Sequence, residues 1–586
     1  MAVMTASKAR AAAGKAPDSR KAANVVYGVL DVPPRGITAL SGLQHVGLMS
    51  VYLVYPVLLA EAAGASSETA AAMISLTLVA LGAGTLLQVI PFGPVGSGFL
   101  CQPIPTVLYM VPALIAAKQG GLPLVFGMTL AAGLLQMALS QALRHLRPIF
   151  PPEIAGLVVL LAGIATGVVG LRAIFATGAE ASAARPAELA LALFTLAVMV
   201  ALNVWARGWL RMFCVLIGMA GGYCVAVMTG RLAPADVAAL AASPLLDLPG
   251  LGHLGWTFDP ALAVPFALAA VAATLKVAGN VTTSQKANDP AWTRPDMRSI
   301  SRGALADGLA NVVAAGLGSQ GLNSSTAAVG IASATGVHSR RVAWAIAAIL
   351  AVLALVPKLG LLLYAMPRPV AGAALVFSST FIVVNGLQIM TSRLLDARRT
   401  LVIGLALVAG LAVDLFPALV ATLPPAWRTM LGTSLVLGTL VGLGLNLLFR
   451  IGVRRTESLA VPQGPVDTAA IEGFMTACGA AWGARRDVIE RASFNLAQSV
   501  ETIFQSGAVA GPLAVRASFD EFRLDLRVSY DGAPLELPDR RPSNEEILAS
   551  EEGERKLAGF MLRRFADRVS ATHKNGRSTV HFHFDH

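Results

Sequence analysis

The chain has 586 residues, of which 55% are hydrophobic and 13% charged, and its mean hydropathy is +0.66. This composition excludes an ordinary soluble protein and predicts a polytopic membrane protein, with a soluble tail after residue 450, where the apolar excess stops. The net charge of +11 does not indicate nucleic acid, because much of the basic excess lies at the ends of apolar segments, where membrane topology places it. We therefore expect a lipid membrane around the protein and no nucleic-acid partner.

The first 24 residues are basic and contain no apolar run of the roughly 7 to 15 residues that a signal peptide carries. We expect residues 1–24 to be a cytoplasmic tail. The chain has four cysteines, Cys101, Cys214, Cys224 and Cys478. Their spacing is not that of a metal site, so the sequence predicts no disulfide, no metal and no cofactor.

Between residues 36 and 450, apolar runs follow one another with short breaks, and a helix needs about 20 residues to cross a bilayer. Fourteen transmembrane segments fit, in a transmembrane domain over residues 25–455. With the N-terminus inside, Lys and Arg gather in alternate loops, as the positive-inside rule requires of cytoplasmic loops. We therefore expect an all-α, multi-pass protein of the inner membrane with both termini in the cytoplasm.

Two stretches share the pattern P-x-x-x-A-G at the start of an apolar helix: PPEIAGLVVL from Pro151 and PRPVAGAALV from Pro367. Under the fourteen-segment count, the two helices enter the membrane from opposite sides. This is the signature of an inverted repeat of seven plus seven helices. Proline at a helix start and small residues inside membrane helices also occur together without any repeat.

Two further segments are too irregular to be simple transmembrane helices: residues 92–110, with three prolines and three glycines, and residues 318–336, which are small and polar. Irregular backbone at membrane depth is tolerated only where protein or water satisfies it. In transporters, such half-helices face each other at the substrate site with their positive N-termini toward the ligand. The NSST run from Asn323 would cap the second one. A pair of long external loops is the alternative.

Four sequence motifs together resemble one family. They are YGVLDVPPRGITALSGLQHVGLM, FPPEIAGLVVLLAGI, RGALADGLANVVAAGLGS and GIASATGVHSRRV. They resemble the first, fifth and ninth helices and the end of the signature segment of the nucleobase/ascorbate transporters (nucleobase:cation symporter 2), which include xanthine, uracil and urate permeases. Gln44 and His45 match the family's Gln-His pair, and Asp307 matches its ninth-helix carboxylate. The resemblance implies a core and a gate of fourteen helices, an elevator-like motion, frequent proton coupling and a homodimer.

The chain differs from this family at the positions that bind the nucleobase in other members. The eighth-helix Glu that binds ring N–H groups aligns with Lys276, in the run ATLKVAGN, and the proton-linked Asp or His one turn later aligns with Asn280. The Gln-Asn pair of the signature becomes Ala327 and Ala328. Most of the groups that would recognise a neutral base are therefore absent.

An ammonium offers three donors and no acceptor, so Lys276 in place of Glu inverts what the cavity can bind. An unpaired cation at membrane depth costs about 2.5 to 3.5 kcal/mol, so Lys276 needs an anion, water or the loss of its proton. We expect a small anionic substrate. The predicted substrate-binding residues are Lys276, Asn280, Gln44, His45, Tyr52, Thr106, Thr326, Ala327 and Ala328. In the alternative, Lys276 pairs with Asp307 and only holds two helices together.

Asp307 and His45 are candidates for coupling or for a structural role. His45 could carry a coupling proton, or it could simply form a hydrogen bond across the core. Tyr52, Tyr55 and Thr106 fit either the lining of a pocket or plain helix packing.

The tail is expected to begin with a linker over residues 456–467 and to form an α/β domain over residues 468–586, because FRLDLRVSYDG and STVHFHFDH alternate as strands do. The order of elements resembles the ATP-binding domain of anti-sigma-factor kinases and histidine kinases, with Asp531 and Gly532 at the place of the adenine-contacting Asp-x-Gly, so these two residues are candidates for residual nucleotide binding. Gln498 and Thr502 replace the catalytic Glu and the metal-binding Asn of that family, which favours a regulatory or dimer-forming domain. HFHFDH at the end predicts an ordinary strand rather than a metal site.

Two functions remain open: a secondary transporter of a nucleobase-like or other organic or inorganic anion, and a transceptor that senses a ligand and signals through its tail. No phosphate loop, nucleophile elbow or zinc spacing supports an enzyme.

Overall fold

The computed structural model divides into two compact units, Met1–Leu447 and Leu448–His586. The structure describes residues 25–91, 93–146, 151–175, 186–232, 238, 240–290, 295–391, 395, 397–424, 427, 431–449, 455–464, 466–484, 486–505, 509, 511–520, 523–543, 547, 551–574 and 576–585. The expected cytoplasmic tail, residues 1–24, lies outside these ranges.

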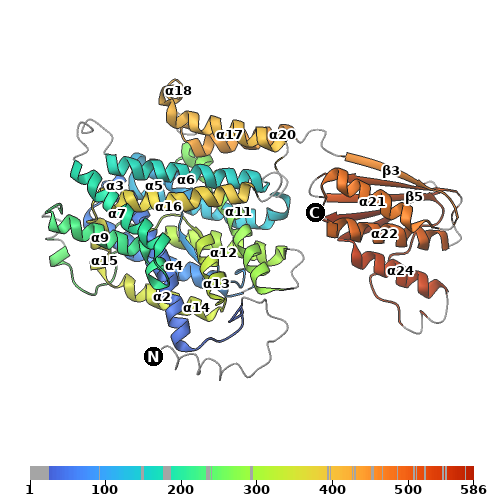
Figure 1. Ribbon diagram of the computed structural model, residues 1–586, viewed down its shortest axis with the longest axis horizontal. Coiled ribbons are helices and arrows are strands. Elements are labelled where there is room, and N and C mark those ends of the chain that lie inside the picture. Colours follow the sequence, from blue (N-terminus) through green and yellow to red (C-terminus); the bar gives the residue numbers. More distant parts are fainter. Residues whose placement is uncertain are drawn as a thin grey trace. The chain divides into compact units, whose positions relative to one another are not determined.

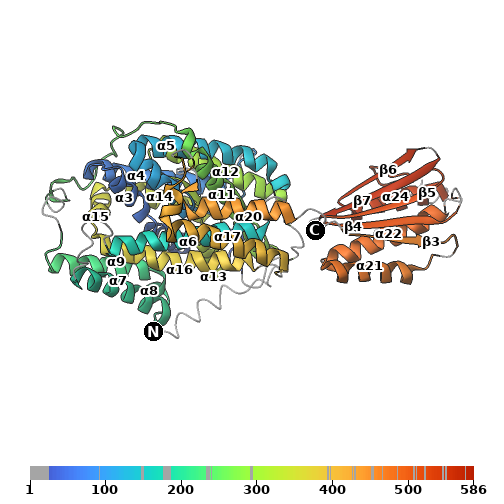
Figure 2. The same ribbon diagram turned by 90° about the horizontal axis from the view of Figure 1, so that it is seen from above.

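The first unit is built almost entirely of helices, which Figures 1 and 2 show in two perpendicular views. Its first half contains α2 (Arg35–Val51), α3 (Val54–Ala62), α4 (Ser67–Val89), β1 (Pro103–Pro105), α5 (Val107–Leu146), α6 (Pro152–Phe175), α7 (Pro186–Trp205), α8 (Trp209–Met212) and α9 (Cys214–Met228). The ribbon of α5 is broken at Gly121, where φ is +69°, so it consists of two consecutive helices.

The second half of the unit repeats this pattern of long helices around one short strand. It contains η1 (Pro260–Leu262), α11 (Ala263–Asn288), α12 (Met297–Gly316), β2 (Leu322–Ser324), α13 (Thr326–Thr335), α14 (Arg341–Ala354), α15 (Pro357–Tyr364), α16 (Arg368–Met390), α17 (Ala397–Leu415), α18 (Pro417–Ala421) and α20 (Ser434–Phe449).

Helices of transmembrane length are present, although fewer than the sequence predicts. Within the described ranges, seven helices are long and apolar enough to cross a membrane, and the bent pair α14 and α15 would make eight. Further apolar helices are shorter, among them α9, α13 and α20. The unit is therefore a multi-pass membrane protein, and the count of fourteen remains a prediction.

The two irregular segments meet in the middle of the unit, as the sequence predicts. β1 and β2 pair antiparallel, with Ile104 opposite Asn323. Each strand leads directly into a helix, β1 into α5 and β2 into α13. The alternative of two external loops is wrong, because β1 and β2 are completely buried.

The helices that carry the duplicated motif, α6 and α16, pack against each other through glycines. A Cβ built on Gly156 would lie 2.7 Å from the Gly386 carbonyl oxygen, and one on Gly372 would lie 2.7 Å from the Gly170 carbonyl oxygen. In each contact, the glycine of one motif meets a glycine of the other helix, and that second glycine follows its own motif glycine by 14 residues. The two helices therefore pack antiparallel, with reciprocal glycine contacts at both ends.

Two groups of helices make up the unit. In one, α5 packs on α3, α11 and α12, and α4 packs on α12, α14 and α15. In the other, α16 packs on α6, α7 and α9, and α17 packs on α6. We call these the α5 bundle and the α16 bundle.

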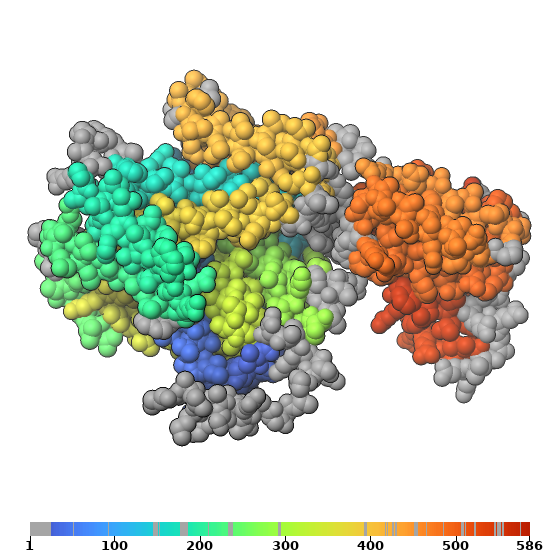
Figure 3. Space-filling model, in the orientation of Figure 1, coloured from blue at the N-terminus to red at the C-terminus, as the bar shows by residue number. Residues whose placement is uncertain are grey.

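Large apolar side chains cover the outside of the first unit. On α7, Leu193, Val204 and Trp205 are exposed, and on α17, Val408 and Leu415 are exposed. Both helices contribute to the surface in the space-filling view (Figure 3). A surface of this kind is suited to lipid.

The second unit is an α/β domain with one antiparallel sheet. Its order is β3-β4-β5-β7-β6. The elements are β3 (Arg455–Val461), α21 (Thr468–Trp482), α22 (Arg486–Gln505), β4 (Leu513–Phe519), β5 (Arg523–Asp531), α24 (Glu551–Phe565), β6 (Arg568–Lys574) and β7 (Arg577–Asp585). Alternate residues of β5 and β7 are buried under the helices, as the sequence pattern predicts.

The expected linker over residues 456–467 is wrong for its first half. β3 spans Arg455–Val461 and pairs with β4 along its whole length, for example Leu459 with Val515. β3 is an edge strand with little apolar alternation, and its partner follows more than fifty residues later, so local pattern alone does not reveal it.

Candidate functional site

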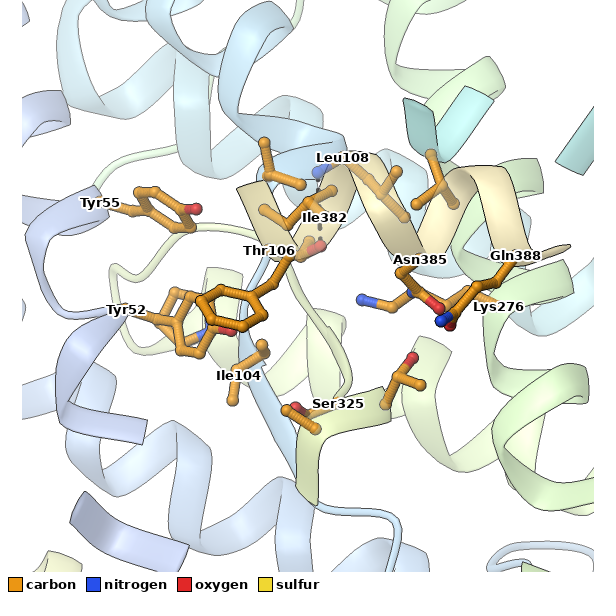
Figure 4. Close-up of a pocket in the computed structure, with 16 residues that line it drawn as sticks. Tyr52, Tyr55, Ile104, Thr106, Leu108, Lys276, Ser325, Ile382, Asn385 and Gln388 are labelled. Carbon is orange, nitrogen blue, oxygen red and sulfur yellow. Dashed lines mark hydrogen bonds between the residues drawn. The ribbon is translucent and has the colours of Figure 1, made fainter. Parts of the chain in front are cut away.

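One pocket in the first unit collects most of the residues that the sequence singles out (Figure 4). It has a volume of about 240 Å³ and lies between the two bundles. Sixteen residues line it: Tyr52, Tyr55, Ile104, Pro105, Thr106, Val107, Leu108, Val159, Lys276, Ser325, Thr326, Ala327, Phe381, Ile382, Asn385 and Gln388. None of these described residues is acidic. The volume is just below the roughly 300 to 1,000 Å³ usual for pockets of drug-sized ligands, so it suits a smaller molecule.

Two helix N-termini open into this pocket, and their local geometry is reciprocal. The Thr106 N–H donates to the Gly321 carbonyl and the Ser325 N–H donates to the Gln102 carbonyl. Leu108 N–H then donates to the Thr106 hydroxyl at the start of α5, as Figure 4 shows. The Ser325 hydroxyl accepts from Ala328 N–H at the start of α13. Since helix N-termini carry partial positive charge, both favour an anion in the pocket.

Lys276 is the only charged side chain among the described residues that line the pocket. It comes from the middle of α11 and makes no hydrogen bond or ion pair with another described residue. In particular, no ion pair within 4.0 Å joins Lys276 to Asp307, so the structure does not show the alternative in which this pair holds two helices together.

Asp307 lies on α12 outside the pocket lining and is 1% exposed. Its carboxylate accepts hydrogen bonds from Gln136 Nε2 at 2.7 Å, Asn323 Nδ2 at 2.8 Å and the Ser324 N–H at 2.9 Å. Two of these donors belong to β2. Asp307 therefore fixes the strand that leads into α13, which is a positioning role.

Asn280 has a similar positioning geometry. Its Nδ2 donates to the Ser324 carbonyl at 3.0 Å and to the Ser324 hydroxyl at 2.8 Å, and its Oδ1 accepts from the Thr326 hydroxyl at 2.9 Å. The side chain is 3% exposed and does not line the pocket. Asn280 thus holds the N-terminus of α13 in place.

The remaining predicted residues divide between the pocket and the core. Tyr52, Thr106, Thr326 and Ala327 line the pocket, whereas Gln44, His45 and Ala328 do not. His45 is 1% exposed, and its Nδ1 lies 3.0 Å from the Ser41 carbonyl oxygen.

Sequence reasoning missed the wall that α16 supplies. Phe381, Asn385 and Gln388 line the pocket and follow one another at i, i+4 and i+7, which places them on one helical face. In Figure 4, Asn385 and Gln388 lie beside Lys276, on the side of the pocket away from Tyr52 and Tyr55. Two polar residues inside the apolar run FIVVNGLQIM were the signal that could have revealed this wall.

Of the candidate nucleotide-binding pair of the tail, Asp531 lies on the surface and Gly532 is half-buried. Asp531 is exposed, and Arg577 Nε is 4.0 Å from its Oδ1. The preceding Tyr530 is the residue that points toward the helices, with 2% exposure. Among the described residues of the whole chain, no group of three or more His, Cys, Asp or Glu side chains could hold a metal ion.

The fold and the pocket define a polytopic membrane protein with a central pocket between two helix bundles, joined to an α/β tail. Comparison with protein families gives its membership. The model of the Permease family (Xan_ur_permease) matches residues 36–419, well over half of the chain. The chain belongs to this family, and it is a permease rather than an enzyme.

The chain is similar to two curated permeases of Escherichia coli. The xanthine permease XanP is 29% identical over 439 residues, which cover 72% of this chain and 94% of XanP. The xanthine permease XanQ is 27% identical over 450 residues, covering 74% of this chain and 96% of XanQ. Among solved structures, murine Solute Carrier 26 family member A9 matches 75% of this chain and 72% of that chain, with 14% identity and a TM-score of 0.46. That structural similarity is too distant to bear on function.

Proposed function

We propose that this permease is a secondary transporter of a small organic anion, of the nucleobase type or related to it. The observation that carries the proposal is the composition of the pocket: one unpaired lysine, two helix N-termini and no acidic lining residue among the described ones. An unpaired ammonium at membrane depth is costly, and a bound anion removes that cost. The permeases XanP and XanQ, which are named for xanthine, support a nucleobase-like molecule.

The proposed mechanism is elevator-like, with the α5 bundle moving against the α16 bundle. The pocket lies between the two bundles, so a displacement of one past the other changes the side from which the ligand is reached. Seven plus seven transmembrane segments in inverted repeat, with both termini in the cytoplasm, belong to the same proposal. The reciprocal glycine contacts of α6 and α16 and the antiparallel pairing of β1 with β2 support it. A homodimer in the inner membrane is part of the same expectation.

The decisive test is transport by purified protein in proteoliposomes. Counterflow of radiolabelled urate or xanthine is measured for the wild type, Lys276→Met and Lys276→Glu. We expect exchange by the wild type and loss of at least about 90% of it in both variants, since removing a fully desolvated charge contact costs about 2 to 5 kcal/mol. Lys358→Met, which changes a lysine outside the pocket lining, is the control and should retain exchange.

The same assay separates transport from pure sensing. A transceptor that only signals would bind the labelled ligand without exchanging it. Binding without counterflow in the wild type would therefore exclude the transporter and favour the sensor. Undiminished exchange by both Lys276 variants would refute the anion site.

We also propose a regulatory, rather than an ATP-hydrolysing, role for the tail. Thr502 occupies the position expected for a metal-binding Asn and donates its hydroxyl to the Gln498 carbonyl at 2.7 Å. Gln498, in the position expected for a catalytic Glu, has no carboxylate to act as a base. Both replacements argue against magnesium-dependent catalysis.

A further inference from the structure

The α16 wall of the pocket contains two side-chain amides that form no hydrogen bond with another described residue. Asn385 and Gln388 line the pocket, and neither makes a hydrogen bond to another described residue. A third free polar group, the Tyr55 hydroxyl, is buried in the same pocket without a partner. Polar groups inside a membrane protein usually find partners or mark a substrate pathway. The alternative is that Gln388, near the end of α16, only extends toward the membrane surface and binds no ligand.

The chemistry of an amide differs from that of the lysine beside it. Lys276 has donors only, so it can bind an acceptor such as an anionic oxygen or ring nitrogen. Asn385 and Gln388 each add two donors and one carbonyl acceptor. Together the three side chains can bind a molecule that presents a negative acceptor and, next to it, one or more N–H groups.

We propose that Asn385 and Gln388 form the α16 half of the substrate site and select anions that carry N–H groups over anions that do not. This inference rests on the proposed function, because it assumes that Lys276 binds the negative charge. A plain carboxylate satisfies Lys276 but offers no N–H group to the amide oxygens of Asn385, which is half-buried, and Gln388, which is exposed. A site built for hydrogen bonds discriminates strongly against ligands that lack the matching group.

The position of the two amides also links recognition to the two bundles. Lys276 belongs to α11, which packs on α5 and α12, whereas Asn385 and Gln388 belong to α16, which packs on α6. A substrate held by all three residues bridges the α5 bundle and the α16 bundle. The amides therefore contribute to affinity only when the bundles lie as in this structure.

The test uses the purified full-length protein and two probes, urate and benzoate. Urate is a planar anion with several N–H groups, and benzoate is a planar anion with none. Binding is measured by calorimetry for the wild type, Asn385→Leu, Gln388→Met and Lys276→Met. The amide variants keep the approximate size of each side chain and remove its hydrogen-bonding groups.

We expect the wild type to bind urate at least 10-fold more tightly than benzoate. Asn385→Leu should weaken urate binding by about 5- to 100-fold, as the loss of a hydrogen-bond partner predicts, and Gln388→Met should weaken it less, because the Gln388 side chain is exposed. Both variants should change benzoate binding by less than about 3-fold. Asn203→Leu is the matched control, because it removes an amide from α7 outside the pocket lining. It should leave both affinities unchanged.

Three outcomes overturn the proposal: no urate preference in the wild type, equal losses for both probes in the amide variants, or no loss in either. Lys276→Met reports separately on the anion site and should weaken both probes. If Lys276→Met changes neither affinity while the amide variants weaken urate alone, the proposed anion function fails and the amide selectivity survives.

Discussion

Lys276 and Asp307 are two ionisable residues inside the same membrane unit, and their surroundings are opposite. Asp307 receives three N–H donors and is almost fully buried, whereas Lys276 has no hydrogen bond to a described residue and faces a pocket. Both lie in apolar stretches of sequence. In this protein, the charged residue that neutral donors surround holds a strand in place. The charged residue that faces a cavity is the candidate for ligand binding.

Replacing Asp307 is expected to have the largest effect on stability. Asp307→Leu should lower the free energy of unfolding by about 3 kcal/mol or more, because it leaves three buried donors without an acceptor. Asp307→Asn keeps one acceptor oxygen and should lose less. Thermal unfolding of detergent-purified protein, followed by tryptophan fluorescence, measures both. Wild-type stability of Asp307→Leu would contradict the positioning role.

The tail contains another ionisable residue, His583, which lies beside two carboxylates and titrates. The His583 ring nitrogens lie 2.7 Å from Asp525 Oδ1 and 3.2 Å from Asp585 Oδ1. These carboxylates, Asp525 first, raise the pKa of His583 from 6.5 to about 9. Its contribution to stability is therefore complete below about pH 6.5 and is lost as the pH rises through about 9.

The loss in the free energy of unfolding amounts to at most about 3 kcal/mol. It should appear in urea unfolding of the tail, which limited proteolysis of the full-length chain can monitor. His583→Gln should be less stable at pH 6.5 and should lack most of the slope toward pH 9. His573→Gln, on the neighbouring β6, serves as the control. An unchanged slope in His583→Gln would assign the pH dependence to other groups.

The smallest expected effect on stability is that of Lys276→Met. Because Lys276 makes no hydrogen bond and no ion pair within 4.0 Å with a described residue, its replacement should change the free energy of unfolding by less than about 1 kcal/mol or raise it, even though transport is abolished. The same thermal unfolding assay measures this. A large destabilisation would show that Lys276 stabilises the fold, and the distinction from Asp307 would fail.

The half-helices and Lys276 could be recognised from the sequence because membrane segments rarely contain irregular backbone or a charged side chain. A lysine inside an apolar run, or a proline-rich and glycine-rich stretch at membrane depth, has few physical explanations. The pairing of β1 with β2 and the position of Lys276 in the pocket agree with that reasoning. The motif of Pro151 and Pro367 likewise marked the two helices that pack antiparallel through glycines.

Other site assignments depended on side-chain direction, which local sequence does not fix. Asn280 and Thr326 look equally suitable for a ligand in the sequence, but only Thr326 lines the pocket, because Asn280 is held by Ser324. In β5, a shift of one residue moves a side chain to the other face, so Tyr530 points inward and Asp531 outward.

Local sequence is enough to predict a multi-pass membrane protein with an α/β tail and an unusual buried cation, because hydropathy, alternation and charge act within a few neighbouring residues. What that cation faces depends instead on how distant helices pack together. The free amides of Asn385 and Gln388 and the separate donors of Asp307 come from helices that are far apart along the chain. Which faces of those helices meet is set by close packing, such as the glycine contacts of α6 and α16, and packing has no counterpart in local composition.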